Sequence, residues 1–224
     1  MKISPTKTYA VLTGDIVGSS KLSKAARQAL PEKMKEAGKA TQKAFPDLVP
    51  LAVDVFRGDS WQLLTTDAVR SLRVALFFRA QIRAGRARGR GLDTRVSIGA
   101  GSVDFVPRKN VSEGDGEAYR LSGRGLEALP RGRFLGWSAP HETLTLIGAT
   151  VGLIDALAQG WTSAQAQAVA GALCGETQDK IAASLPGKIT RQAVSKHLDA
   201  AHWEAVEAAL AALENEFGKA YGNL

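Results

Sequence analysis

The chain has 224 residues, of which 45% are hydrophobic and 23% charged, and this length suits one good core with a smaller second unit. A single cysteine, Cys174, excludes an internal disulfide and any cysteine-based zinc cluster, and three scattered histidines indicate no histidine-rich metal site. No apolar run approaches the ~18 residues that a membrane span needs, and no signal-like core follows the basic start. We therefore expect no membrane partner and a cytoplasmic location.

The net charge of +7 is unevenly distributed along the chain. Residues 1–140 contain 24 basic and 13 acidic residues, whereas residues 141–224 contain 5 and 9, so the net charges are +11 and −4. A basic excess of this kind favours an anionic partner such as a nucleic acid or a polyphosphate. Much of it lies in a glycine-interrupted run from Arg83 to Arg90, which we interpret either as a solvated loop or as a phosphate-binding surface.

The first part of the chain predicts a sheet with helices. Residues 8–15 form a continuous apolar run, which is typical of a strand buried on both faces. A helical region extends to about residue 44 with a break at Pro31, and residues 51–57 and 61–66 then predict a hairpin, because Gly58-Asp59 suits a tight turn. We expect a helix over 67–85, a strand over 95–103, a helix over 117–129 and a last strand over 133–137.

This order of elements predicts an α+β fold in which helices cover one face of a mixed sheet. After Pro140 the chain becomes rich in alanine and the strand pattern ends, so we expect two domains, residues 1–140 and residues 141–224. The second is predicted to be all helical, with helices over 144–159, 162–173, 178–185 and 191–202 and a helical tail to residue 217.

Two aspartates end predicted strands beside a glycine. Asp15 follows the first strand, and Asp59 stands at the tip of the hairpin. If these elements are neighbours, both carboxylates converge at one edge of the sheet, where they and the Ile16 carbonyl would hold Mg²⁺ or Mn²⁺. The alternative is that Asp15 caps the next helix and Asp59 is only a turn residue. Gly18 and Ser19 open the helical region and can present backbone N–H groups to a phosphate, although a plain N-cap explains them equally well.

These motifs resemble those of the class III adenylyl and guanylyl cyclases. The strand end of that family is similar to Gly14-Asp15-Ile16-Val17-Gly18-Ser19, and its Gly-Asp hairpin is similar to Arg57-Gly58-Asp59. The segment 116–124 resembles the family's helix with an asparagine and an arginine four residues apart. Residues 8–136 as a whole resemble the SatD-type proteins, a bacterial group with a similar domain.

The resemblance implies a ferredoxin-like cyclase core that binds a nucleoside triphosphate and two metal ions at a homodimer interface. Asp15 and Asp59 would be the metal ligands, and Arg124, supplied by the other subunit, would stabilise the phosphates. Two positions depart from the family, because Arg120 replaces the asparagine and Phe56 stands where a purine-reading lysine is expected. Phe56 offers no polar group to a base, whereas Arg120 adds positive charge where phosphates would lie.

The resemblance therefore yields two sets of candidate residues in the first domain. Glu113 lies near the second base-selecting position of the family. The candidate nucleotide-binding residues are Gly18, Ser19, Phe56, Arg57 and Glu113, and the candidate catalytic residues are Arg120 and Arg124.

Residues 178–199 have the spacing of a helix-turn-helix. Apolar residues such as Ile181, Val194 and Leu198 can pack inward, which leaves the start of the second helix free for phosphates and base edges. Residues 192–198 resemble recognition helices of bacterial winged-helix or sigma-like regulators. The alternative, favoured by the charge of −4, is an alanine-rich hairpin that only dimerises the protein. The candidate DNA contacts are Lys188, Thr190, Arg191, Gln192, Ser195, Lys196 and His197.

One main hypothesis and two rivals follow from these patterns. The main hypothesis is a homodimeric regulator that binds double-stranded DNA and whose cyclase-like domain binds a nucleotide signal and sets the dimer geometry. The first rival is an active, metal-dependent nucleotidyl cyclase with an unusual base preference. The second rival is a non-catalytic assembly module with a helical dimerisation tail.

Overall fold

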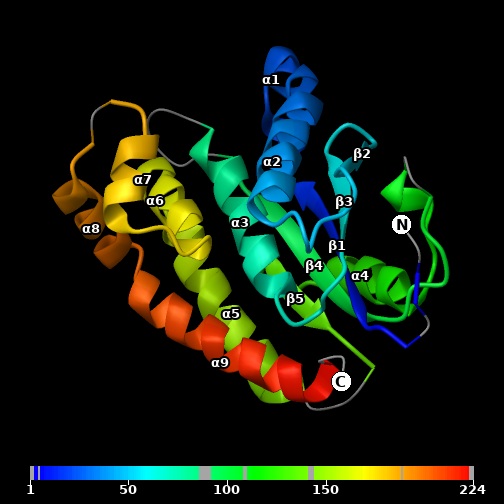
Figure 1. The fold of residues 1–224 in the computed structure, drawn as a ribbon. Coiled ribbons are helices and arrows are strands. Elements are labelled where there is room, and N and C mark those ends of the chain that lie inside the picture. The colour runs from blue at the N-terminus through cyan, green and yellow to red at the C-terminus, as the bar shows by residue number, and fades with distance from the viewer. Residues whose placement is uncertain are drawn as a thin grey trace.

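A five-stranded mixed sheet forms the centre of the protein (Figure 1). The computed structural model describes residues 3–4, 6–85, 92–107, 110–140, 144–187 and 189–221. The sheet has the order β2-β3-β1-β4-β5, in which β1 pairs antiparallel with β3 and β4 while β4 and β5 are parallel. This arrangement confirms the predicted α+β class. The strands are β1 (Tyr9–Ile16), β2 (Asp54–Phe56), β3 (Ser60–Thr65), β4 (Thr94–Gly101) and β5 (Leu135–Ser138).

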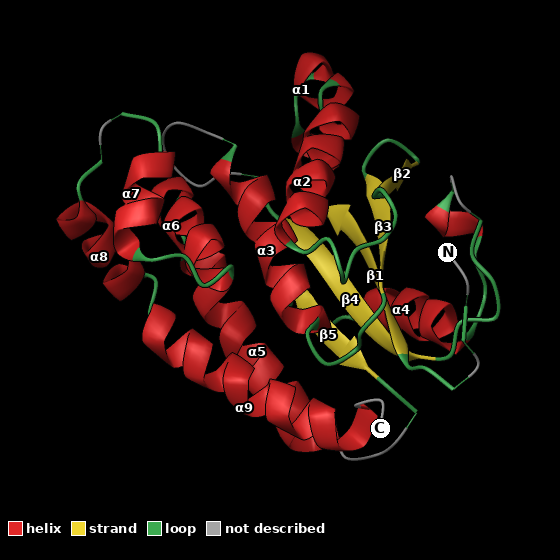
Figure 2. Cartoon of the chain, viewed as in Figure 1, coloured by secondary structure: helices red, strands yellow, loops and turns green. Residues whose placement is uncertain are grey.

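Helices cover both faces of the sheet (Figure 2). On one face α2 (Leu30–Ala44) and α3 (Ser71–Ala84) pack over side chains that include Leu12 of β1. On the other face α4 (Glu117–Glu127) packs over side chains that include Val11. The expectation that helices cover only one face is therefore wrong. Its physical reason was already present in the sequence, because a strand buried on both faces needs cover on both.

The second part of the chain is helical, as expected. Thr162 begins α6 with a capping box that includes Gln165, and Thr177 and Thr190 cap the next two helices. No helix within the described ranges is long and apolar enough to cross a membrane. The helices are α5 (Leu144–Gly160), α6 (Ser163–Leu173), α7 (Gln178–Ser184), α8 (Arg191–Ala200) and α9 (Trp203–Tyr221).

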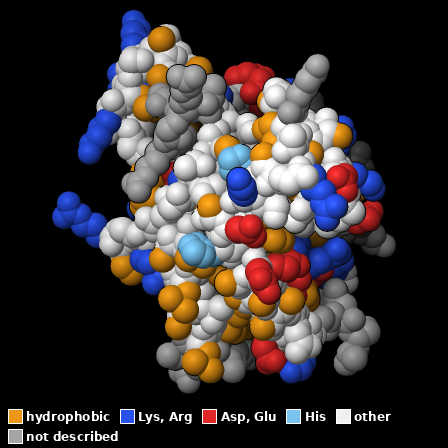
Figure 3. Space-filling model, turned by 90° about the vertical axis from the view of Figure 1, so that its left-hand side faces the viewer, with side chains coloured by type: hydrophobic (Ala, Val, Ile, Leu, Met, Phe, Trp, Pro, Cys, Tyr) orange, Lys and Arg blue, Asp and Glu red, His pale blue; other side chains and the backbone are white. Residues whose placement is uncertain are grey.

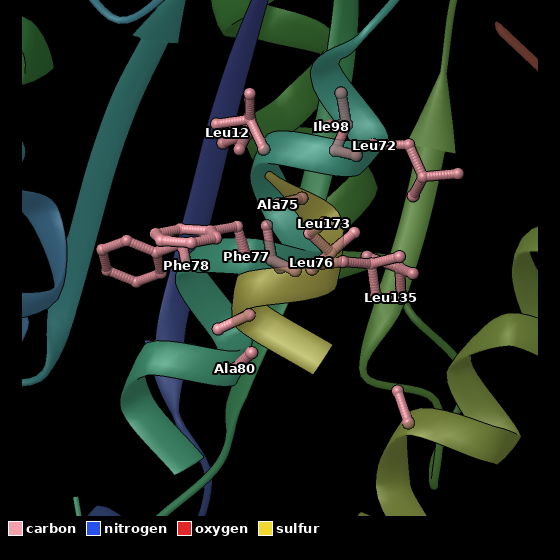
Figure 4. Close-up of a cluster of buried hydrophobic side chains, with 14 of the residues drawn as sticks. Leu12, Leu72, Ala75, Leu76, Phe77, Phe78, Ala80, Ile98, Leu135 and Leu173 are labelled. Atoms are coloured by element: carbon pink, nitrogen blue, oxygen red, sulfur yellow. The ribbon is translucent and has the colours of Figure 1, made fainter. Parts of the chain in front are cut away.

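One hydrophobic cluster runs through both parts of the chain. The helix α3 lies between the sheet and α6, and Figure 4 shows Leu72 and Leu76 of α3 in one cluster with Leu12, Ile98 and Leu135 of the sheet and Leu173 of α6. At the far end of α9, the Phe217 ring stacks on Trp137 with the ring centroids 4.2 Å apart. The division at residue 140 stays a prediction, and the residues on its two sides share one core.

A buried network of ion pairs joins α3 to the second part. Arg79 is fully buried, and its guanidinium donates to Asp93 at 2.8 and 2.9 Å and to Asp155 of α5 at 2.8 Å. Asp155 also accepts the backbone N–H of Phe134 at 2.8 Å. Burial alone would lower the pKa of Arg79, but the hydrogen bonds and attraction of the two aspartates outweigh it and the pKa is raised. Arg79 therefore stays charged inside the protein.

Arg83, the first arginine of the basic run, belongs to the same network. It is 2% exposed, and its guanidinium donates to Asp93 at 2.5 Å, to the Gln159 carbonyl at 3.1 Å and to the Trp161 carbonyl. For Arg83, the expectation of a solvated loop and the expectation of a phosphate-binding surface are both wrong, because its charged group is buried and bound inside the fold. The remaining arginines of the run, Arg86, Arg88 and Arg90, lie outside the described residues.

Replacement of Arg79 by methionine is expected to lower the free energy of unfolding by about 3–5 kcal/mol, because Asp93 and Asp155 lose a buried partner. Urea denaturation followed by circular dichroism measures this loss. The control is Arg70→Met, just before the same helix, where Arg70 is exposed and pairs with Asp67 at 3.5 Å, so the loss should stay below ~1 kcal/mol. Equal losses in the two variants would contradict a structural role for the network.

Candidate functional site

The two aspartates singled out in the sequence lie at the same edge of the sheet. In the register of β1 and β3, Asp15 is opposite Ser60, the neighbour of Asp59. The Ile16 N–H donates to the Asp59 carbonyl at 3.0 Å, so the end of β1 is fastened to the hairpin turn. The backbones of Asp15 and Asp59 therefore lie next to each other at one edge of the sheet.

The hairpin turn itself carries backbone strain. Arg57 and Gly58 have φ angles of +52° and +83°. Glycine adopts such angles freely, whereas in other residues they cost roughly 1–2 kcal/mol. Strained positions of this kind cluster at functional sites, which makes the Arg57 side chain a candidate for ligand contact.

Asp15 is held by Arg95, the residue opposite it on β4. The Arg95 Nε–H donates to Asp15 Oδ1 at 2.9 Å, and a second guanidinium N–H donates to Oδ2. The hydrogen bond to Asp15 raises the pKa of Arg95, and their mutual attraction adds to this while partial burial opposes it. Both carboxylate oxygens of Asp15 are thus engaged in a charged, two-point pair.

Asp59 borders a hollow of 290 Å³ between the hairpin turn and the start of the helical region. The Ser19 hydroxyl donates to Asp59 Oδ2 at 2.5 Å. Arg27 and Arg57 are exposed, and within the described residues neither forms an ion pair. The elements around the hollow are η1 (Ser19–Lys21), α1 (Lys24–Gln28) and the start of α2. Its lining residues are Ser19, Ser20, Arg27, Leu30, Arg57, Gly58 and Asp59.

The donor set at this edge does not fit an ion held by both aspartates. Arg95 occupies the carboxylate of Asp15, and a divalent cation there would have to displace it. Across the described ranges, no three His, Cys, Asp or Glu side chains form a group that could hold a metal ion. Asp59 alone suits a magnesium ion that arrives with phosphates, because Mg²⁺ keeps several waters and needs only one or two carboxylates.

The other predicted nucleotide residues are spread around this edge. Gly18 precedes η1 with a φ of +66°, and η1 has three residues, so it is not a helix start of the expected length. Phe56 is half-buried on β2 beside Arg57. Glu113 is exposed in η2 (Val111–Glu113) and accepts from Asn110 at 2.5 Å. Of the predicted nucleotide set, the hollow therefore brings together Ser19 and Arg57.

The two candidate catalytic arginines lie on α4, on the opposite face of the sheet from α2 and α3. Arg120 pairs with Asp115 at 2.7 Å and with Asp104 at 3.7 Å, and it is exposed. Arg124 is also exposed and donates to the Arg120 carbonyl at 3.3 Å. Neither side chain lines the hollow beside Asp59. Within the described residues of one chain, these arginines therefore lie outside the hollow that Asp59 borders.

The candidate DNA contacts lie on and just before α8. Ile181 of α7 and Val194 and Leu198 of α8 are buried, as predicted, and α8 packs on both α6 and α7. Thr190 accepts the Ala193 N–H at 3.2 Å and caps α8. Arg191, Gln192 and Lys196 are exposed, whereas Ser195 and His197 are half-buried and Lys188 lies outside the described residues.

Two features around α8 differ from a typical helix-turn-helix. Residues 185–190 separate α7 from α8, which is longer than the usual turn of three or four residues. Figure 3 shows the face with α8, and both basic and acidic side chains are scattered over its visible part. Charge that attracts DNA would therefore have to act locally at the start of α8.

Two residues of the site were missed in the sequence. Arg27 is one charge among several in a polar helical segment, and only its position against the hairpin turn distinguishes it. Arg95 stands at the start of a predicted strand, but its partner depends on the register of β1 with β4. A pairing between residues 80 positions apart leaves no signal in a single sequence.

Comparisons with known proteins give likenesses of fold only. No family model matches the chain, and no curated protein matches it. One similar solved structure is the catalytic core of a rhodopsin-guanylyl cyclase with converted specificity in complex with ATPαS, at 19% identity and a TM-score of 0.46, covering 63% of this chain and 81% of that chain. Another is the active GGEEF domain of a diguanylate cyclase from Vibrio cholerae, at 12% identity and a TM-score of 0.42, covering 61% and 85%.

Replacement of Arg95 by methionine is expected to raise the affinity of the protein for Mn²⁺ about tenfold, because Asp15 is freed to act beside Asp59. Electron paramagnetic resonance of free Mn²⁺ in a titration measures the change. Arg70→Met, which removes an exposed arginine away from the site, should leave the affinity unaltered. An Arg95→Met protein that binds Mn²⁺ no better than the parent would show that Arg95 does not block the site.

Proposed function

We propose that the chain is a homodimeric, DNA-binding regulator that binds the phosphates of a nucleotide in the hollow beside Asp59. The observation that carries the nucleotide part is the placement of two guanidinium groups, Arg27 and Arg57, around one hollow with Ser19 and Asp59, neither of them in an ion pair with another described residue. The resemblance to the SatD-type proteins and the helix-turn-helix assignment belong to this proposal.

The chemistry of the hollow suits a phosphate chain with its magnesium ion. Two guanidinium groups can bind phosphate oxygens through charge-assisted hydrogen bonds, and the Asp59 carboxylate can bind a Mg²⁺ carried by those phosphates. The volume of 290 Å³ is at the lower limit of small-molecule sites, so it suits the phosphates better than a whole nucleotide. The base would lie over Phe56 and the open surface, where little distinguishes one base from another.

The DNA part of the proposal rests on α8. Its capped first turn is exposed and carries Arg191, Gln192 and Lys196, which are residue types that bind phosphates and base edges. Two copies of α8 in a homodimer would contact two half-sites of duplex DNA. A nucleotide would regulate such a dimer by binding more tightly to its DNA-competent or to its DNA-incompetent form.

Binding without turnover is favoured over the cyclase alternative by the pair of Asp15 and Arg95. A cyclase of the class III type would need Asp15 free for metal, and here both of its oxygens are bound by Arg95. Arg120 is also engaged, by Asp115 and Asp104. The alternative keeps one supporting feature, because Arg124 is exposed on α4 and accessible to a second subunit. Steady release of pyrophosphate by the parent protein would favour the cyclase.

The double variant Arg27→Gln/Arg57→Gln is expected to bind Mg-ATP at least tenfold more weakly, because both charge-assisted contacts to phosphate are lost. Isothermal titration calorimetry with Mg-ATP and Mg-GTP measures this change, and the two nucleotides should bind with similar affinity. Arg131→Gln, which removes an exposed arginine elsewhere, is the control. Unchanged binding of Mg-ATP in the double variant would show that the hollow does not bind the phosphates of the nucleotide.

The double variant Arg191→Ala/Lys196→Ala is expected to weaken duplex binding and to reduce the slope of log K against log salt by about 2, because two phosphate contacts disappear. Fluorescence anisotropy with duplexes selected from genomic fragments measures both quantities. The control is Lys35→Ala/Lys39→Ala, which removes two exposed charges from α2. If the control lowers the slope as much, DNA is bound by general basic charge rather than by α8.

A further inference from the structure

The outward face of α5 carries two leucines that project into solvent. Leu146 is 81% exposed and Leu153 is 69% exposed. They are seven residues apart, so they lie on one side of the helix. The single charged residue of α5, Asp155, points inward and is fully buried in the ion-pair network. This face of α5 therefore has apolar surface and no charged side chain of its own.

The exposed positions of α5 follow the spacing of a helix-pairing seam. Exposed residues recur every three or four positions along the helix, and two half-buried residues complete the row. This is the periodicity of a coiled-coil seam, in which side chains of one helix fit between those of another. The row, which we name the α5 stripe, consists of Leu146, Ala149, Thr150, Leu153, Ala156, Leu157 and Gly160.

We propose that the α5 stripe binds the α5 stripe of a second copy of this chain, with the two helices antiparallel and a two-fold axis beside Leu153. In this alignment Leu146 lies opposite Gly160 of the partner subunit, and Leu157 lies opposite Ala149 of the partner subunit. Each leucine away from the axis thus meets a small residue, which is the packing that interdigitating helices need. A parallel pair in register would instead stack leucine on leucine and leave gaps between the alanines.

The α5 stripe and the neighbouring surface of α9 together have the size of a weak dimer interface. The stripe spans residues 146–160, or about 22 Å, and α9 runs beside α5 with exposed alanines such as Ala205 and Ala212. Two helices, each about 10 Å wide, give a footprint of about 440 Å² per copy. A standard interface covers about 800 Å² per partner, so we expect a reversible dimer with micromolar affinity.

The space-filling view agrees with this assignment. In Figure 3 the hydrophobic side chains are densest on the lower part of the face, and α5 and α9 form the lower part of the molecule in Figure 1. The inference rests on the proposed function only for its need of a homodimer. The α5 interface requires neither nucleotide nor DNA, so the interface and the proposed function can fail separately.

Sedimentation velocity of the full chain, over a range of concentrations and without nucleotide or DNA, tests the interface. The parent is expected to show a monomer–dimer equilibrium, and Leu153→Glu to raise the dissociation constant at least tenfold, because two carboxylates would meet at the axis. Ala25→Glu, at an exposed position of α1 outside both α5 and α9, is the control and should leave the dissociation constant unchanged. Because Leu153 is exposed, the circular dichroism spectrum of Leu153→Glu should match that of the parent.

Cysteine cross-linking tests the antiparallel arrangement in a Cys174→Ser background, since Cys174 is the only native cysteine. Mild oxidation should link two copies of Leu153→Cys, and it should link Leu146→Cys to Gly160→Cys in a mixture. Leu146→Cys alone should stay unlinked. Self-linkage of Leu146→Cys would overturn the antiparallel pair. A parent that stays monomeric at all concentrations, or one whose stripe binds anionic vesicles instead, would overturn the interface even if nucleotide and DNA binding held.

Discussion

The structure depends on a buried pair of arginines on α3. Arg79 and Arg83 are enclosed by Asp93 at the start of β4 and by Asp155 and backbone carbonyls at and just beyond the end of α5. Charges in such a position are tolerated only when every partner is in place, because an unpaired buried charge costs several kcal/mol. The second part of the chain therefore supplies partners for charges buried in the first, and α5 and α6 form one side of the core that contains the sheet.

The same network reaches the edge of the sheet where the candidate nucleotide site lies. The carboxylate of Asp93 binds the two arginines, while its carbonyl accepts the Val17 N–H at 2.8 Å. The next residue, Thr94, donates its hydroxyl to the Asp15 carbonyl at 2.7 Å. A contiguous set of contacts thus joins the end of β1 to α5. Under the proposed function, this set of contacts would give a nucleotide at the candidate site a physical route to the helices that carry α8, and a measured coupling is what would establish that route.

Much of the fold was predictable because local chemistry determines it. The apolar run of β1 and the Gly58 turn act over a few residues, and each is found as expected. The errors concern contacts between distant residues. Arg83 read as part of a solvent-facing run because its partners Asp93 and Trp161 become visible only when α3 is enclosed. The position of Asp15 at the edge of the sheet was predicted correctly, but the pairing of its carboxylate with Arg95 was not.

Native-state hydrogen exchange in low concentrations of urea tests most directly whether the sheet and the helices form one unit. If the arginine network unites them, amides of β1, β4, α3, α5 and α6 should open together with a single free energy, equal to that of global unfolding. A lower, separate free energy for α5 and α6, with β1 and β4 still protected, would contradict the account. The second part would then be an independent attachment, and a nucleotide at Asp59 would have no rigid connection to α8.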